Sequence, residues 1–415
     1  MSRFNKISHK QKLLAPAGDF ISLKAAIDAG ADEVYFGIKG LNMRAGAKNF
    51  EIEDLNKIVK ICHDNNAKAL LAMNTIIYED ELKKVESLII NAKKIGVDAI
   101  ICWDFSVIEF CKKHNMKIHI STQASLSNYS AIRSLKKNYP NVERIVLARE
   151  CSLIDIKDIN NKLQKERINV EVEVFIHGAM CVSESGRCFM SQEIFGKSAN
   201  RGECLQPCRR LYEVYLKDSE EGHGLLLGKD YVMSPKDLCA MPIIDQIIDS
   251  GVAALKIEGR NRNPEYVHTV VSAYRKIIDE YSKNKDINEL KKSLLEELKK
   301  VYNRGFSTGF YLGKPMNEWT KEYGSSSIET KEHIGKIMNY YPKVSVAEIM
   351  IESGSMKENN DIMIQGITTG ILKQKAKDMM IDNKKVLKAE KKDMITIKVN
   401  SKVRKNDQVY KIKKR

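Results

Sequence analysis

Residues 13–37, LLAPAGDFISLKAAIDAGADEVYFG, contain a short apolar run, an amphipathic stretch and a second apolar run. Between the runs, apolar residues recur at spacings of three and four, and a glycine precedes the second run at Glu33. This spacing is typical of a helix that packs one face against a sheet. A helical connection of this kind joins parallel strands. The segment therefore predicts a βαβ unit of an α/β protein.

The same alternation continues through the first 260 residues. Several runs are almost entirely apolar, as expected of parallel strands covered on both faces. Eight such strands close a TIM-like (β/α)8 barrel, which is the fold that we predict. The eight runs are LLAPAG from Leu13, EVYFG from Glu33, KALLAMN from Lys68, DAIICWD from Asp98, KIHISTQ from Lys117, RIVLARE from Arg144, VEVEVFIHG from Val170 and ALKIEGR from Ala254.

Each run ends near a side chain that can form hydrogen bonds. In order along the chain these residues are Asp19, Tyr35, Asn74, Asp104, Gln123, Glu150, His177 and Glu258. The carboxyl ends of all strands in a parallel barrel share one face, where catalytic groups gather. Glu150, His177 and Glu258 are candidates for proton transfer, and Asn74 and Gln123 for contact with substrate. Any single one of them is also explained by a helix cap or an anchored loop.

The spacing between runs divides the chain into three parts. Residues 1–11 form a basic leader, and residues 12–330 form the barrel with its closing helices near 264–282 and 286–303. A cysteine-rich insertion, at about 178–235, follows the seventh strand and includes a hairpin around Gly222-His223-Gly224. From 331 to 415, short strand-like runs separated by turns predict a small β-barrel domain.

The charge of the chain is concentrated near its carboxyl terminus. The formal net charge is +15, and residues 331–415 hold 20 Lys and Arg against 10 Asp and Glu. A basic module of this kind favours a polyanionic partner such as RNA or DNA, and a lysine-rich solvated surface is the alternative. We find no run of about 18 apolar residues and no secretory leader, so we expect a cytoplasmic protein with no membrane partner.

Four of the nine cysteines are grouped within the insertion. Cys181, Cys188, Cys204 and Cys208 follow the pattern C-x6-C-x15-C-x3-C. Four thiolates suit either a tetrahedral zinc ion or a four-iron cluster, and the spacing leaves both open. Disulfides are not expected in a reducing cytoplasm. Cys239 is a candidate fifth ligand, although its position at the start of a helix favours ordinary packing.

Other residues near the cluster have more than one interpretation. His177 is a metal ligand, a general base or a core histidine. Arginines surround the cysteines, and they either bind an anionic substrate or offset the charge of the thiolates. These arginines are Arg187, Arg201, Arg209 and Arg210.

Three stretches carry a resemblance to a known family. Residues 13–37, the segment FIHGAMCVSESGRCFMS at 175–191, and residues 233–267 with NRGFSTGF at 303–310 resemble the U32 (collagenase-like) peptidase family. The last of these stretches is similar to the branch of the family that acts on transfer RNA. The resemblance covers most of residues 12–313, and the basic module at the end of the chain looks like the C-terminal β-barrel of longer members.

The resemblance implies a function and a cofactor. The RNA branch makes 5-hydroxyuridine at the wobble position of tRNA without molecular oxygen, with prephenate as the apparent oxygen donor. It carries a [4Fe-4S] cluster, whose ligands match Cys181, Cys188, Cys204 and Cys208 here. Cys208 favours the RNA branch, because one member of the quinone branch has arginine in its place. The resemblance also allows a protein partner of the same family.

Within this interpretation Arg187, Arg260 and Arg262 are candidates for binding a carboxylate donor, because a guanidinium matches a carboxylate. The alternative is a U32-type peptidase, for which the sequence has no HExxH motif, and SESG at 183–186 lacks the first glycine of a GxSxG elbow. A second alternative is a non-catalytic RNA-binding subunit with a structural zinc ion.

Overall fold

The computed structural model describes residues 11–44, 48–217, 224–283 and 285–415, without the side chains of 216–230. The leader, except residue 11, and Gly222 and His223 of the predicted hairpin turn lie outside the described residues. Within the described residues, eight parallel strands close a barrel, because the eighth strand pairs with both the first and the seventh. These strands are β1 (Lys12–Ala17), β2 (Glu33–Phe36), β3 (Lys68–Ala72), β4 (Ala99–Cys102), β5 (Ile118–Ile120), β6 (Val142–Val146), β7 (Glu171–Gly178) and β11 (Ala254–Ile257).

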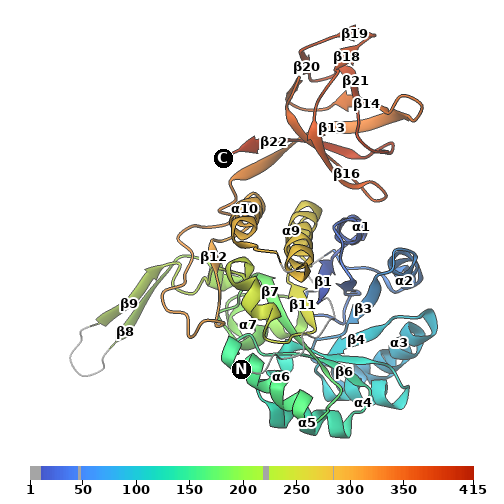
Figure 1. The fold of residues 1–415 in the computed structure, drawn as a ribbon. Helices are drawn as coiled ribbons and strands as arrows, with labels where there is room; N and C mark the ends of the chain where they lie inside the picture. Colours follow the sequence, from blue (N-terminus) through green and yellow to red (C-terminus); the bar gives the residue numbers. More distant parts are fainter. Residues whose placement is uncertain (1–10, 45–47, 218–223, 284) are drawn as a thin grey trace.

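Helices cover the outside of the barrel, as the βαβ pattern predicts (Figure 1). Asp19 caps the first helix by accepting a hydrogen bond from the Ser22 amide at 2.8 Å, and Asp104 caps the fourth from the Ser106 amide at 2.9 Å. Two of the eight residues at strand ends therefore serve as helix caps. The helices are α1 (Phe20–Asp28), α2 (Leu55–Asp64), α3 (Leu82–Ile95), α4 (Phe105–Lys113), α5 (Tyr129–Asn138), α6 (Leu153–Lys165), α8 (Ile244–Ile248), α9 (Pro264–Ser282) and α10 (Asn288–Lys299).

The interior of the barrel has an apolar part and a charged part. Leu14, Leu70 and Ile101 belong to a small buried apolar cluster, while Leu13 and Leu71 pack in the larger core that includes the helices. This alternation follows the two-residue period of a strand. Charged side chains from β2, β6, β7 and β11 form a buried ionic network; they are Glu33, Arg144, Glu173 and Lys256.

The insertion leaves the barrel at the end of β7 and returns along the same strand. Cys239 pairs with His177 and Leu238 with Gly178, which places β10 antiparallel to β7. Two strands of the insertion, β8 (Tyr212–Lys217) and β9 (Gly224–Asp230), pair as a hairpin that projects beside the barrel (Figure 1). The elements of the insertion and its return are α7 (Met190–Phe195), β8, β9 and β10 (Asp237–Cys239). A later strand, β12 (Phe306–Ser307), pairs in parallel with β10.

The carboxyl-terminal domain is an antiparallel β domain with its own apolar core. Its eight-stranded sheet has the order β17-β16-β22-β13-β14-β21-β18-β19, which stays open in the described residues. The edge strand β17 packs against α1 and α9, and just beyond it the Lys377 carbonyl accepts a hydrogen bond from the Lys398 amide at 3.3 Å. The strands are β13 (Glu329–Tyr341), β14 (Val346–Ile351), β15 (Ser355–Lys357), β16 (Asp361–Gly366), β17 (Gly370–Lys375), β18 (Met380–Ile381), β19 (Lys384–Lys385), β20 (Lys388–Glu390), β21 (Met394–Lys398) and β22 (Gln408–Lys414).

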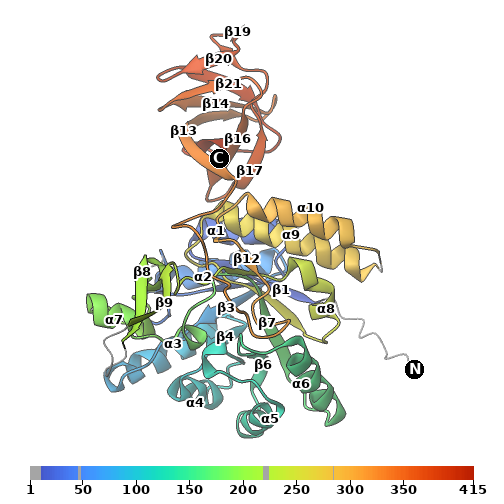
Figure 2. The same cartoon turned by 90° about the vertical axis from the view of Figure 1, so that its left-hand side faces the viewer.

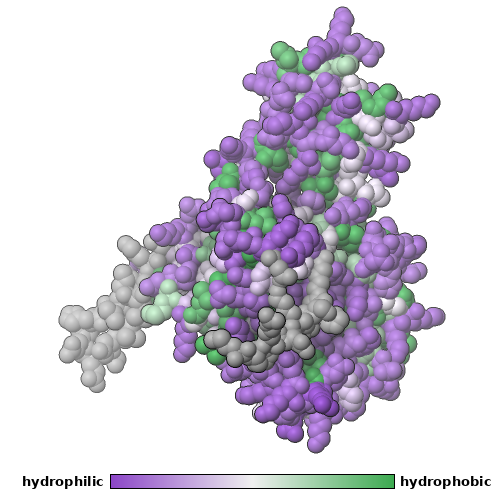
Figure 3. Space-filling view, viewed as in Figure 1, coloured by the Kyte–Doolittle hydropathy of each residue, from purple (hydrophilic) through white to green (hydrophobic). Residues whose placement is uncertain are grey.

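Polar contacts join the β domain to the barrel. Lys331 pairs with Glu265 at 2.8 Å, and Lys373 donates to Thr269 Oγ1 at 3.1 Å. Both views place this domain beyond α1, α9 and α10 (Figures 1 and 2). The face seen in Figure 3 is mainly hydrophilic, with apolar side chains scattered over it. In the part of the chain that the structure describes, no helix combines the length and apolar character needed to cross a bilayer.

Candidate functional site

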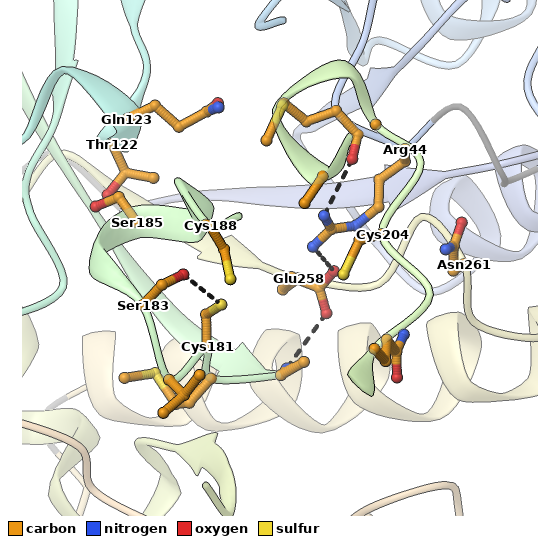
Figure 4. A pocket seen from close by; sticks show the side chains of 18 of the residues that line it. Arg44, Thr122, Gln123, Cys181, Ser183, Ser185, Cys188, Cys204, Glu258 and Asn261 are labelled. Carbon is orange, nitrogen blue, oxygen red and sulfur yellow. Dashed lines mark hydrogen bonds and ion pairs between the residues drawn. The ribbon is translucent and has the colours of Figure 1, made fainter. Parts of the chain in front are cut away.

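A cavity of about 700 Å³ opens at the carboxyl ends of the barrel strands. Its walls combine residues from strand ends with residues of the insertion, and Figure 4 shows this arrangement. Asn74, Gln123, Glu150 and Glu258, all predicted from strand ends, line it. Cys181, Cys188, Cys204 and Cys208 also line it. The fold thus brings together most of the candidate residues.

The four cysteines lie on separate loop segments of the insertion. Cys181 and Cys204 are exposed, Cys188 is half-buried and Cys208 is buried. Burial raises the pKa of Cys208 to about 11, with a smaller contribution from the neighbouring cysteines. Cys181 Sγ lies 3.0 Å from Ser183 Oγ, as Figure 4 shows. The thiols share one cavity and differ in their access to it.

The donor set suits a metal centre, although the thiols are not gathered into one. In the described residues, no three His, Cys, Asp or Glu side chains are already disposed to hold a metal ion. Four thiols around one cavity are nevertheless the donor chemistry that iron–sulfur clusters and zinc both use. Cys239 is buried, lies 3.8 Å from Tyr274 Oη and is not part of the cavity wall. Its surroundings match the packing role.

Glu258 is an ionised carboxylate at the base of the cavity. It is 8% exposed, pairs with Arg44 at 3.2 Å and accepts from the Ala179 amide at 3.2 Å. Burial raises its pKa, but the guanidinium groups of Arg44, Arg262 and Arg149 outweigh burial and hold the pKa at about 2. At neutral pH this carboxylate therefore holds arginines in place more readily than it accepts a proton.

Two glycines let the Glu258-Gly259-Arg260 turn fit against the strand ends. A Cβ atom on Gly18 would lie 2.2 Å from the Arg260 carbonyl oxygen. Gly178 has a φ of +112°, and a Cβ there would lie 2.7 Å from the Glu258 carbonyl oxygen. The turn is therefore fixed in the barrel and presents its side chains to the cavity.

Two arginines of the cavity wall form no close ion pair, although the Glu258 carboxylate attracts both. Arg260 is 7% exposed and donates to Asn42 Oδ1 at 3.1 Å. Arg149 donates to the Ala179 carbonyl at 2.6 Å, and its guanidinium lies 3.9 Å from the centre of the Phe175 ring. Within the described residues, neither has a carboxylate within 4 Å. Burial lowers the pKa of Arg260 to about 10, and it also lowers that of Arg149.

Arg262 and Arg304 share the buried carboxylate of Asp237. Arg304 donates to Asp237 Oδ1 at 3.1 Å, and Arg262 lies 3.9 Å from Oδ2. The Arg262 guanidinium also lies 3.8 Å from the centre of the Tyr302 ring. Arg262, Arg304 and Tyr302 all line the cavity, so Asp237 anchors two cationic side chains at its edge.

Gln123 presents an unused hydrogen-bond donor. Its Oε1 accepts from Asn74 Nδ2 at 2.6 Å and from Ser121 Oγ at 3.1 Å, which sets the orientation of its amide. Its Nε2 is buried and has no partner in the structure. Because a buried donor without a partner is costly, Gln123 is suited to donate to a ligand in the cavity.

His177 and Arg187 do not line the cavity. His177 is 1% exposed and surrounded by the rings of Tyr266, Tyr274 and Phe306, and its Nδ1 lies 3.3 Å from Tyr274 Oη. Burial lowers its pKa to about 3, so it is a neutral core histidine, the third of its sequence interpretations. Arg187 turns to Ser125 Oγ at 2.9 Å and to Glu184 at 3.2 Å. Glu150 lines the cavity as an exposed residue.

Sequence reasoning missed Arg149 and Arg44 of the wall, and it missed Asp237, which anchors two other residues of the wall. Arg149 stands beside Glu150 in the run RIVLARE, and it is the arginine that lies against Phe175. Arg44 lies in the loop after β2, and Asp237 lies in the return strand β10. The available signal was an arginine next to a predicted strand end, which applies to Arg149 alone.

The fold and the site together define a (β/α)8-barrel protein whose cavity is lined by cysteines and arginines. The chain belongs to peptidase family U32, whose family model matches residues 18–321. This confirms the family that the sequence resembles.

Relatives in this family have names of two kinds. A collagenase of Porphyromonas gingivalis is 41% identical and covers 97% of this chain and 98% of its own length. The tRNA hydroxylation protein P1 of Bacillus subtilis is 37% identical over 80% of this chain and 78% of its own length. The 23S rRNA 5-hydroxycytidine C2501 synthase of Escherichia coli is 36% identical over 66% of this chain and 40% of its own length.

Proposed function

We propose that this chain is an RNA-modifying enzyme that hydroxylates C5 of a uridine at the wobble position of tRNA without molecular oxygen. The observation that carries the proposal is the cavity, where four cysteines and several arginines line the same wall, and where Arg149 and Arg260 form no close ion pair in the described residues. The names of two relatives, a tRNA hydroxylation protein and an rRNA hydroxycytidine synthase, support a pyrimidine of RNA as the substrate.

In this proposal Cys181, Cys188, Cys204 and Cys208 hold a [4Fe-4S] cluster. A bound cluster would supply one-electron redox chemistry. Nearby arginines support such a centre, because thiolate ligands carry negative charge that Arg209 and Arg149 would offset. Zinc is the alternative occupant of the same ligands.

The residues of the wall suit a pyrimidine and a small anionic donor. Gln123 Nε2 is placed to donate to a carbonyl oxygen of the base, and Asn74 holds Gln123 in that orientation. Arg260, Arg149 and Arg262 would bind the carboxylates of an oxygen donor such as prephenate. Replacing C5–H with C5–OH removes two electrons from the base, so the donor that supplies the hydroxyl group must take up two electrons.

The β domain would supply affinity for the RNA backbone. Its excess of lysine and arginine suits phosphate contacts, which give affinity and position. While the backbone is held by such contacts, an unstacked loop nucleotide can enter the cavity of the barrel. The contacts of Lys331 and Lys373 with α9 tie this domain to the barrel that carries the cavity.

Nucleoside mass spectrometry tests the proposed function. tRNA from a strain that lacks this chain should lose 5-hydroxyuridine, and the wild-type gene should restore it. Anaerobically purified protein should absorb near 400 nm and contain iron and sulfide, as expected of a cysteine-bound cluster. Unchanged nucleosides would contradict the hydroxylase. RNA binding without product and with one zinc per chain would favour the non-catalytic subunit.

A peptidase is the second candidate, because the relative that covers 97% of this chain is named a collagenase. The residues of the cavity do not form a Cys–His or Ser–His pair, since no histidine in the described residues lines it. Cleavage of gelatin by the wild-type protein, abolished by Cys181→Ser or Ser183→Ala, would support the peptidase. Absence of cleavage in a preparation that modifies RNA would exclude it.

A further inference from the structure

A second cavity, of about 330 Å³, adjoins the first. The two share Cys204, Arg209, Tyr302 and Arg304, while Arg210 and Tyr323 line the second alone. The volume is at the lower end of the range for pockets that bind small ligands. A ligand there would lie next to whatever occupies the barrel mouth.

The lining of the second cavity is cationic and aromatic. Three arginines and two tyrosines contribute to it, and no acidic residue of the described chain does. Arg209 is held by neutral acceptors, Ser234 Oγ at 2.9 Å and the Pro235 carbonyl at 2.7 Å. Among the described residues it has no carboxylate within 4 Å, and it lines both cavities, so it can contact an anion in the second cavity while it lies beside the cysteines.

The outer wall is an exposed arginine–tyrosine pair. Arg210 lies 5.4 Å from the centre of the Tyr323 ring and donates to Tyr323 Oη at 3.1 Å. Tyr323 is 61% exposed, and Arg210 has no carboxylate within 4 Å in the part of the chain that is described. The guanidinium of an exposed arginine thus lies directly against an exposed aromatic ring at the rim of the cavity. Proteins that bind single-stranded nucleic acid pair such charge with such rings.

We propose that the second cavity binds the nucleotide next to the one that is modified. Arg209 and Arg210 contact its phosphate, and its base stacks on Tyr323. The proposal rests on the RNA substrate proposed above and adds a subsite that reads the sequence neighbour of the target.

Binding of a synthetic stem-loop RNA to the full-length protein tests the subsite. Tyr323→Ala should weaken the Kd about tenfold, the size expected for one lost base stack. Two further RNAs carry an abasic site beside the target uridine, one on its 5′ side and one on its 3′ side. One of these two RNAs should bind the wild type as weakly as the intact RNA binds Tyr323→Ala. Tyr323→Ala should then lose nothing more on that RNA, while the abasic site on the other side should affect both proteins alike.

Arg210 is tested by salt dependence. Arg210→Ala should reduce the slope of log K against log salt by about 0.7, the value for one phosphate of a single strand, and Arg210→Lys should retain most of the slope.

Tyr78→Ala is the matched control for Tyr323→Ala, because Tyr78 is 55% exposed and the centre of its ring lies 4.8 Å from the Arg201 guanidinium, but it lines neither cavity. It should leave the Kd unchanged.

Two results would overturn the subsite while the proposed function stands. One is that Tyr323→Ala binds every RNA with the affinity of the wild type, while the wild type forms hydroxyuridine. The other is that Tyr323→Ala or Arg210→Ala raises the KM for the carboxylate donor and leaves RNA binding unchanged. That result would show that the second cavity binds the donor. Absence of hydroxyuridine formation by the wild type would instead contradict the proposed function itself.

Discussion

Arginines lie toward opposite ends of one barrel, and they differ in how their charge is balanced. Toward the amino ends of the strands, Arg144 pairs with Glu33, Glu171 and Glu173. Toward the carboxyl ends, Arg149 and Arg260 have neutral partners only among the described residues. Arg144 is paired within the protein, whereas Arg149 and Arg260 are attracted by the Glu258 carboxylate without forming an ion pair within 4 Å in the described residues. Balance of charge thus separates a structural arginine from a candidate binding residue.

The largest effect is expected at the carboxyl end, where the cluster ligands are proposed. Cys204→Ser should reduce hydroxyuridine to below detection and remove absorption near 400 nm, because a hydroxyl group is a poor ligand for iron–sulfur clusters. Cys239→Ser, outside the cavity, is the control and should keep the absorption band. An unchanged spectrum in Cys204→Ser would remove Cys204 from the ligand set.

The next largest effect is expected on stability at the amino end. Arg144→Ala leaves three carboxylates without their shared cation, so the free energy of unfolding should fall by about 3–5 kcal/mol. Denaturant unfolding measures this change. A loss below about 1 kcal/mol would show that the network is not balanced as the distances indicate.

Arg260→Met tests the opposite end with a change of similar volume. It removes a buried charge that forms no ion pair within 4 Å in the described residues, so stability should fall far less than in Arg144→Ala. Product formation should fall by about 10- to 100-fold, the size of a lost charge-assisted hydrogen bond. If Arg260→Met were as destabilised as Arg144→Ala, the contrast between the two ends would be lost.

The smallest effect is a pH dependence from the amino end. Burial raises the pKa of Glu173, but Lys256 and Arg144 outweigh burial and lower it below the usual value of about 4.3. A lowered folded-state pKa stabilises the protein above the unfolded pKa, and this contribution disappears as the pH falls through the folded value. Unfolding measured from pH 6 to pH 3 should therefore show falling stability, with a shallower slope in Glu173→Gln. Equal slopes would remove Glu173 from this account.

The barrel and its cysteine-rich face were predictable because their signals are local. Strand and helix periods recur along the chain, and Asn74, Gln123 and Glu258 follow strands whose ends must converge. His177 and Arg187 sit equally close to those signals but point elsewhere. Direction depends on packing against Tyr274 and Ser125, which lie 97 and 62 residues away. The role of Asp237 could not be predicted for the same reason, because its partners Arg262 and Arg304 lie in distant loops.

The two-way attachment of the insertion to β7 has a consequence for how such proteins can diversify. The chain departs at Gly178 and comes back beside it at Leu238, so the segment between them begins and ends at neighbouring points. The free energy of closing a loop grows only slowly with its length. The β8–β9 arm can therefore be lengthened, shortened or exchanged while the barrel keeps its register.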